Sequence, residues 1–217
     1  MKNRRFALLL VTLLLDLLAS PFVEGYRLGR VAFNVFSTDV LFSALYSISE
    51  NKRRFLWGLV LFVPAVAGVW LGYFAPDSLI MSQAPILMTF FLIYTAYRVL
   101  MHVLRSDEVT SESIFAALSV FLLLGVIWSM FYFGLESFQP GSFKGLGTLG
   151  DYSGGLGSSC LYYSYVTLTT LGYGDVTPVT SVARSLSYVE ALMGQLFLAV
   201  LVARLVGMHI AHSMKEK

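Results

Sequence analysis

The stretch TTLGYGD, residues 169–175, is the segment that decides the fold of this chain. It places two glycines around a tyrosine, between two apolar stretches, and it offers neither a nucleophile paired with a base nor a metal-ligand spacing. No strand pattern precedes it, so a phosphate-binding glycine loop is not indicated. Glycine permits backbone torsion angles that other residues avoid. We therefore expect this segment to act through its backbone rather than through reactive side chains.

The composition of the chain indicates a lipid environment. The 217 residues are 57% hydrophobic and 13% charged, and the mean hydropathy is +0.73. Soluble domains carry about 25% charged residues, so most of this chain is expected in the bilayer. A formal net charge of +2 gives no reason to expect nucleic acid, and no soluble partner is evident. The lone cysteine, Cys160, excludes an intramolecular disulfide and a cysteine-based metal cluster.

Six apolar segments are long enough to cross a bilayer as helices, which takes about 20 residues each. They are residues 6–23, 31–48, 55–74, 84–104, 114–135 and 182–208. A shorter apolar piece, residues 161–169, follows a glycine-rich loop and is too short to cross. We therefore expect an all-α membrane protein with six transmembrane helices, in which the short piece re-enters the membrane between the fifth and the sixth.

The distribution of basic residues predicts the orientation of these helices. The side that we assign to the cytoplasm carries Lys2, Arg4, Arg5, Lys52, Arg53, Arg54, Arg105, Lys215 and Lys217. Both termini are therefore expected inside, and the short apolar piece enters from outside. A cleaved signal peptide at the N-terminus remains an alternative, although Asp16 interrupts its apolar run.

A non-helical loop at membrane depth must be buried in protein or line a water-filled cavity. The segment VTLTTLGYGD, residues 166–175, resembles the end of the pore helix and the selectivity filter of the potassium channel pore family. The resemblance covers about residues 109–207 well and the first hundred residues only in outline. It implies a potassium-selective channel of the bacterial inner membrane, without enzymatic activity, assembled as a homotetramer in the lipid bilayer. No cofactor is implied other than the permeant K⁺ ions.

The same resemblance assigns roles to individual residues. It implies that K⁺ is bound by the carbonyls of Thr170, Leu171, Gly172 and Tyr173 and by the Thr170 hydroxyl, with Gly174 at the outer mouth of the filter. It places Asp175, Tyr163 and Thr169 in support of the filter, and we expect the Tyr163 hydroxyl to donate a hydrogen bond to Asp175. In the last helix it assigns the hinge and the cavity lining to Gly194, Gln195, Leu198, Val202 and Val206. For Gly194, close packing against another helix is an equally favoured alternative to a role in bending the helix.

The first four helices, residues 1–108, are expected to form a transmembrane domain unlike a voltage sensor, in front of a pore domain at residues 109–217. The fourth helix carries only Arg98, His102 and Arg105, so few charges could move through the membrane field. Weak or absent voltage sensing follows. Two alternatives remain for Asp39: an ion pair with Arg98, or a lone acid near the end of a helix.

Other readings of the sequence are less favoured. The glycine-rich stretch GLGTLG, residues 145–150, is interpreted as part of a flexible outer loop rather than a nucleotide site, because no strand precedes it. A non-selective cation channel is disfavoured by Tyr173, and a multi-repeat transporter subunit by the single filter copy. A membrane-embedded enzyme is disfavoured because no Ser-His pair or HExxH motif is found.

Overall fold

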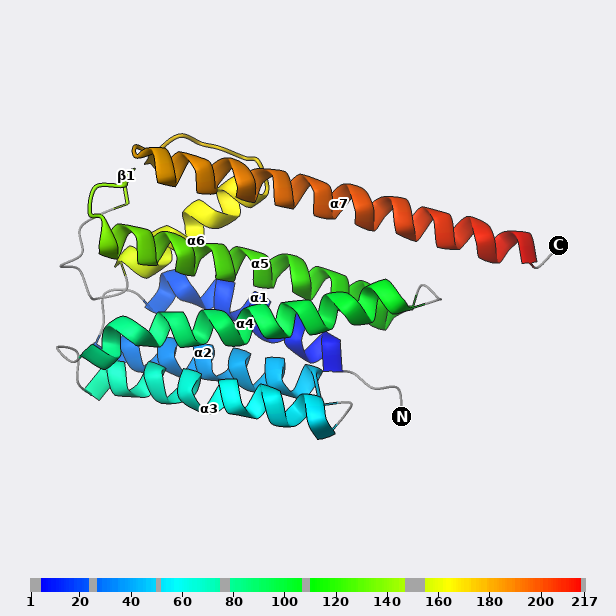
Figure 1. Ribbon diagram of the computed structural model, residues 1–217, viewed down its shortest axis with the longest axis horizontal. Helices are drawn as coiled ribbons and strands as arrows, with labels where there is room; N and C mark the ends of the chain where they lie inside the picture. Colours follow the sequence, from blue (N-terminus) through cyan, green and yellow to red (C-terminus); the bar gives the residue numbers. More distant parts are fainter. Residues whose placement is uncertain are drawn as a thin grey trace.

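The computed structural model of the protein describes residues 5–23, 27–49, 52–74, 79–106, 110–146 and 155–215. These residues form seven helices and one short antiparallel pair of strands (Figure 1). The helices are α1 (Arg5–Val23), α2 (Arg27–Ser47), α3 (Lys52–Phe74), α4 (Leu79–Arg105), α5 (Ser111–Phe138), α6 (Gly155–Leu168) and α7 (Ser181–Lys215). The strands are β1 (Phe143–Lys144) and β2 (Thr177–Pro178).

Three of the described helical segments are long and apolar enough to cross a membrane: Pro85–Arg105, Ser111–Phe138 and Ser181–Arg204. Phe55–Leu71 is a shorter apolar helix. With an almost entirely helical chain, these segments identify an α-helical membrane protein. The number of six crossings and the re-entry of α6 stay predictions.

The long helices lie side by side in a bundle (Figure 1). Helix α5 packs against both α1 and α4, while α3 packs against α4 and α1 against α2. On the other side of α5, the short helix α6 packs against α5 and α7. The first residues of α1 and the last residues of α7 point to the same end of the bundle (Figure 1). Thus α5 joins the first four helices to the part of the chain that contains residues 169–175.

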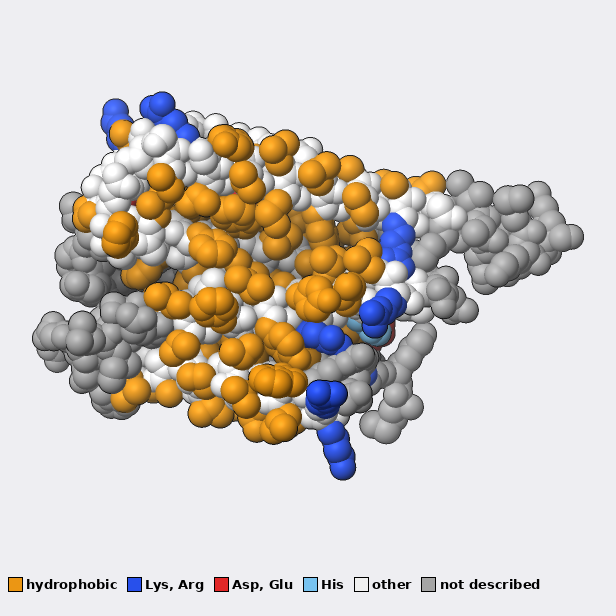
Figure 2. Space-filling model, in the orientation of Figure 1, with side chains coloured by type: hydrophobic (Ala, Val, Ile, Leu, Met, Phe, Trp, Pro, Cys, Tyr) orange, Lys and Arg blue, Asp and Glu red, His pale blue; other side chains and the backbone are white. Residues whose placement is uncertain are grey.

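The core of the bundle is apolar and continuous from α1 to α5. Its fully buried members include Leu9, Leu41, Phe91, Leu92 and Leu123. The core therefore extends across the boundary that the sequence predicts near residue 108. The outward face is also rich in hydrophobic side chains, and Lys and Arg lie at its ends (Figure 2). A wide apolar surface of this kind suits contact with lipid rather than water.

Candidate functional site

Helix α6 ends where the TTLGYGD segment begins, and the chain turns back on the helix at that point. The Thr169 N–H donates to the Tyr165 carbonyl at 3.0 Å, and the Leu171 N–H donates to the Val166 carbonyl at 2.9 Å. With 14 residues, α6 is about 21 Å long, shorter than the hydrocarbon core of about 30 Å. Its C-terminal end carries the negative pole of the helix dipole, and that pole adjoins Thr169.

The backbone of the segment alternates in handedness. Thr170, Gly172 and Gly174 have φ of 58°, 56° and 80°, whereas Leu171 and Tyr173 are not among the residues with positive φ. Positive φ is uncommon for a β-branched residue such as threonine and costs free energy, so it marks a candidate functional position. A Cβ added at either glycine would meet no atom of the chain within 4 Å. The glycines are therefore required by the backbone conformation and not by lack of space.

Asp175 is held by Tyr162, which differs from the sequence-based expectation. The Tyr162 hydroxyl donates to Asp175 Oδ2 at 2.7 Å, and this bond holds the pKa of the Asp175 carboxyl below its usual value. Tyr163, the expected donor, is buried and its hydroxyl lies 2.6 Å from Ser187 Oγ on α7. Neighbouring residues on a helix point about 100° apart, so only one of the two tyrosines can face the loop.

The loop beyond α5 is fixed against the part of the chain that follows Asp175. Strand β1 pairs with β2, and the Val179 N–H donates to the Ser142 carbonyl at 2.8 Å. The buried Glu136 carboxylate accepts hydrogen bonds from the backbone N–H groups of Gly141 and Phe143, at 2.7 and 3.1 Å. A side chain at Gly145 would collide with the Asp175 carbonyl.

These contacts correct part of the flexible-loop interpretation of residues 145–150. Gly145 and the buried Leu146 are packed in place, because the strand pair brings them against the TTLGYGD segment. Residues 147–150 lie outside the described part of the chain.

A buried acid, Glu190 of α7, is hydrogen-bonded to side chains of both α5 and α6. It was not among the site residues predicted from the sequence. Glu190 is fully buried, and Ser164 Oγ of α6 donates to its Oε1 at 2.5 Å. The Tyr132 hydroxyl of α5 donates to the other carboxylate oxygen. Ser164 Oγ also lies 2.7 Å from the Gly125 carbonyl of α5. The signal that could have found Glu190 is an acid inside an apolar span, which usually has a partner and a role.

Helix α7 approaches the end of α6 at Gly194. A Cβ at this position would collide with the carbonyl oxygen of Leu168, the last residue of α6. This contact supports the close-packing alternative for Gly194, and bending of the helix there stays a prediction. The next residue, Gln195, donates from Nε2 to the Thr170 hydroxyl at 3.2 Å. The structure therefore brings Gln195 to the start of the TTLGYGD segment.

The remaining predicted site residues are exposed in the single chain. On α7, Leu198, Val202 and Val206 are 40%, 57% and 53% exposed. Their predicted role in lining a cavity stays a prediction. In the segment itself, residues 169–175 are all exposed, and Tyr173 is 68% exposed.

The expected pair of Asp39 and Arg98 is not formed. Among the described residues no ion pair joins them: Asp39 is exposed on α2, while Arg98 lines a cavity near the end of α4. Asp39 is thus a lone acid within the part of the chain that the structure describes. The helices place the two side chains in different surroundings, which the sequence could not predict.

Comparison with known proteins finds a similarity to ion channels in this region. Residues 117–210, somewhat less than half of the chain, match a family model described as "Ion channel". The matched region contains most of α5, all of α6, the TTLGYGD segment and most of α7. No curated protein and no solved structure matches the chain. The second half of this α-helical membrane protein is therefore similar to an ion channel pore domain.

Proposed function

We propose that the protein is a potassium-selective channel whose filter consists of residues 170–174. The observation that carries the proposal is the positive φ at Thr170, Gly172 and Gly174 with ordinary φ between them. A backbone that alternates in this way lines its N–H groups up on one side, so we expect the carbonyls on the other side. Rows of carbonyls can replace the hydration shell of K⁺.

The surroundings of the segment favour a cation. The C-terminal dipole of α6 places partial negative charge beside Thr169 and Thr170, where the Thr170 hydroxyl adds another oxygen. At the opposite end, Asp175 supplies a carboxylate, and the hydrogen bond from Tyr162 lowers its pKa and so favours its charged form. Leu171 contributes only its carbonyl, so its side chain does not alter the proposed ligand set.

The exposure of the segment supports assembly with further copies of the chain, which we propose to be a homotetramer. In a single chain, residues 169–175 leave non-helical backbone uncovered, and such backbone is not tolerated in contact with lipid. Further copies of the chain around a central axis would enclose it, together with the exposed residues of α7. In this arrangement the chain crosses the membrane six times with α6 re-entrant, and both termini are cytoplasmic in a bacterial inner membrane.

Ion selectivity is the direct test of this proposal. Purified protein in liposomes should conduct potassium and rubidium and strongly exclude sodium. Equal fluxes of sodium and potassium would support the alternative, a non-selective channel on the same fold. Native mass spectrometry of the same preparation should give the mass of a homotetramer, and a conducting monomer or dimer would refute the assembly.

Voltage dependence is a separate test, of the first four helices. Arg98, His102 and Arg105 are the basic residues of the second half of α4. Moving one charge across the membrane is worth about 2.3 kcal/mol per 100 mV. Three basic residues at most therefore give the conductance a shallow dependence on voltage. A steep conductance–voltage curve in planar bilayers would contradict this part of the proposal.

A further inference from the structure

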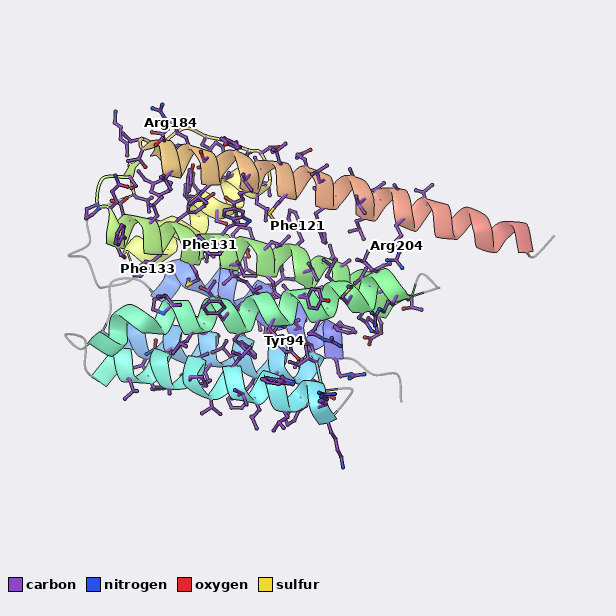
Figure 3. All side chains as sticks on the ribbon, viewed as in Figure 1. Tyr94, Phe121, Phe131, Phe133, Arg184 and Arg204 are labelled. Atoms are coloured by element: carbon purple, nitrogen blue, oxygen red, sulfur yellow. The ribbon has the colours of Figure 1, made fainter. Side chains whose placement is uncertain are left out.

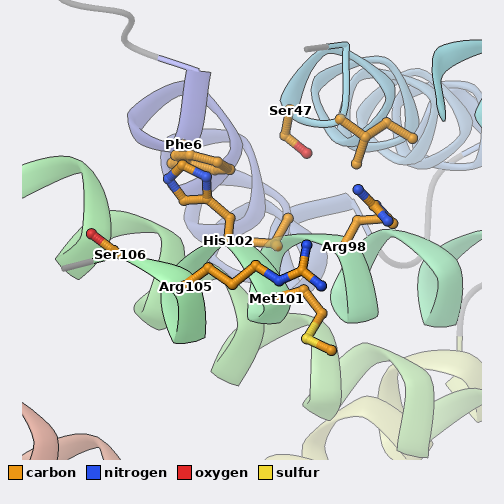
Figure 4. Close-up of a pocket in the computed structure, with 9 residues that line it drawn as sticks. Phe6, Ser47, Arg98, Met101, His102, Arg105 and Ser106 are labelled. Carbon is orange, nitrogen blue, oxygen red and sulfur yellow. The ribbon is translucent and has the colours of Figure 1, made fainter. Parts of the chain in front are cut away.

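A cavity of about 200 Å³ lies among the first four helices, at the end of the bundle where α1 begins. Figure 4 shows it between α1, α4 and the end of α2. Its lining combines cationic, hydroxyl and apolar side chains, among them Phe6, Ser47, Ile48, Arg98, Met101 and Arg105. It is remote from residues 169–175, so the proposed filter does not account for it.

The basic residues of the cavity share one face of α4. Arg98, His102 and Arg105 are spaced at i, i+4 and i+7, which places them on one side of a helix. All three line the cavity, and the His102 ring packs on Phe6 with a centroid distance of 4.7 Å. The sequence spacing therefore collects these groups around one space instead of distributing them around the helix.

The two arginines have no counter-ion within the described part of the chain. No carboxylate of the described residues, Asp39 included, forms an ion pair with Arg98 or Arg105. Ionisable residues within a membrane span usually pair with another group. Arg98 lies inside the candidate span Pro85–Arg105, and its guanidinium group faces the cavity with no carboxylate of the described residues bound to it.

We propose that this cavity binds a phosphate-bearing anion through Arg98 and Arg105. The planar guanidinium group suits phosphate because it can donate two parallel hydrogen bonds to it. The apolar walls formed by Phe6, Ile48 and Met101 suit the chain of an anionic lipid, whereas a small soluble phosphate would use only the arginines. Basic cavities between transmembrane helices on the cytoplasmic side are suited to anionic headgroups.

The surroundings add to the attraction for an anion. Helix α3, which begins with Lys52 and Arg53, starts at the same end of the bundle (Figure 1), and Arg204 also lies there (Figure 3). Figure 2 shows Lys and Arg side chains gathered at this end. Ser106, which also lines the cavity, accepts a hydrogen bond through its carbonyl from Arg204 of α7 at 2.7 Å. A ligand in the cavity thus sits beside the contact between the α4–α5 connection and the long last helix.

Binding can be measured on the full-length protein in a neutral detergent. Dioleoyl phosphatidylglycerol, dioleoyl phosphatidylcholine and inorganic phosphate are titrated separately, with bound lipid counted by native mass spectrometry and thermal stability followed by tryptophan fluorescence. The variants are Arg98→Gln, Arg105→Gln and Arg98→Lys. Lys52→Gln is the matched control, because it removes one positive charge from the same end of the bundle outside the cavity.

We expect phosphatidylglycerol to bind more tightly than phosphatidylcholine, and each arginine-to-glutamine change to weaken it about tenfold, the effect of losing one charged hydrogen bond. Arg98→Lys should fall between, and Lys52→Gln should bind as the parent chain does. Stabilisation by inorganic phosphate, lost in Arg98→Gln, would identify the ligand as a soluble anion; stabilisation by the lipid alone would identify a headgroup.

Two outcomes would overturn the site. Equal binding of phosphatidylglycerol and phosphatidylcholine, with no response to inorganic phosphate, would show that the cavity does not select phosphate charge. An equal loss in Lys52→Gln and Arg98→Gln would show diffuse attraction to the surface. Retention of the parent oligomer on size exclusion confirms that the Arg98→Gln and Arg98→Lys proteins are folded. These readouts do not depend on ion selectivity, so they stand apart from the test of the filter.

Discussion

The two halves of the molecule are held together by different interactions. In α1–α4 the helices share an apolar core, and side-chain hydrogen bonds such as Thr12 to Ser43 at 2.7 Å and Trp70 to Thr38 at 3.2 Å join uncharged groups. In the α5–α7 half, by contrast, hydroxyl and carboxyl groups join α6 to both neighbouring helices and to the TTLGYGD segment. The apolar core is shared by both halves up to α5.

This difference follows from what each half has to position. In the first half, an apolar core packs the long helices against one another. A segment with alternating φ has no regular hydrogen-bond pattern of its own, so the structure around it must fix its position. Interhelical hydrogen bonds supply directional contacts for that purpose, and they gather where α6 meets α5 and α7.

The largest effect is expected from Gly174→Ala. A methyl group penalises the φ of 80° at this position, so selective potassium flux in liposomes should be lost while the protein still inserts and assembles. The matched control is Gly134→Ala on α5, where an added Cβ also meets no atom within 4 Å and φ is not positive. Normal flux in Gly174→Ala would mean that the carbonyls of this segment do not bind the ion.

The sequence predicted where the helices lie because apolar length is a local signal. The two glycines of TTLGYGD likewise predicted positive φ at Gly172 and Gly174, but the positive φ of Thr170 was not predicted, because threonine does not favour that conformation. The predicted re-entrant piece, residues 161–169, falls on α6, which begins earlier, at Gly155. Small and polar residues precede it, so hydropathy alone could not find that end.

The partners of individual side chains were not predictable in the same way. The choice between Tyr162 and Tyr163 as the donor to Asp175 depends on the rotation of α6 about its axis, which α5 and α7 set by packing. Glu190 was missed because its partners, Tyr132 and Ser164, are distant in sequence and carry no motif.

The next largest effect is expected from Glu190→Ala. The change leaves the buried Tyr132 hydroxyl without its acceptor, whereas Ser164 can still donate to the Gly125 carbonyl. An unsatisfied buried group costs about 1–3 kcal/mol. The assembled protein should therefore unfold at a clearly lower temperature and lose part of its discrimination against sodium. Glu190→Gln keeps an acceptor oxygen and should be milder; equal behaviour of the two variants would show that the hydrogen bonds are unimportant.

A similar or slightly smaller loss is expected from Gly194→Ala. The added methyl group would meet the Leu168 carbonyl, and overpacking of a tight contact typically costs about 1–3 kcal/mol. Gly207→Ala on the same helix is the control, because a Cβ there meets no atom within 4 Å. Thermal unfolding of both variants should separate them, and an unchanged Gly194→Ala would mean that α7 can move away from α6 freely.

A contact of the same chemical type in the first half should matter less. Thr12→Val removes the hydrogen bond to Ser43, and such bonds between membrane helices average about 0.6 kcal/mol. We expect a small drop in unfolding temperature and unchanged ion selectivity. If Thr12→Val were as damaging as Glu190→Ala in both measurements, the contrast between the two halves would be wrong.

The smallest effect is expected from Tyr162→Phe, and it concerns pH. The hydrogen bond from Tyr162 holds the pKa of Asp175 below its usual 3.8, so the charged form is favoured by the folded protein. Any stability that this contributes is present above pH 3.8 and is lost as the pH falls through the lowered pKa. Without the hydroxyl, the pKa should rise toward the usual value.

External acid should therefore reduce potassium flux at a higher pH in Tyr162→Phe than in the parent chain, when flux is followed as the outside pH is lowered. Tyr163→Phe is the matched control, because that hydroxyl contacts Ser187 and not Asp175. Its acid midpoint should stay where it is in the parent chain. A shift in Tyr163→Phe with none in Tyr162→Phe would restore the pairing that the sequence suggested and contradict the rotation of α6 described above.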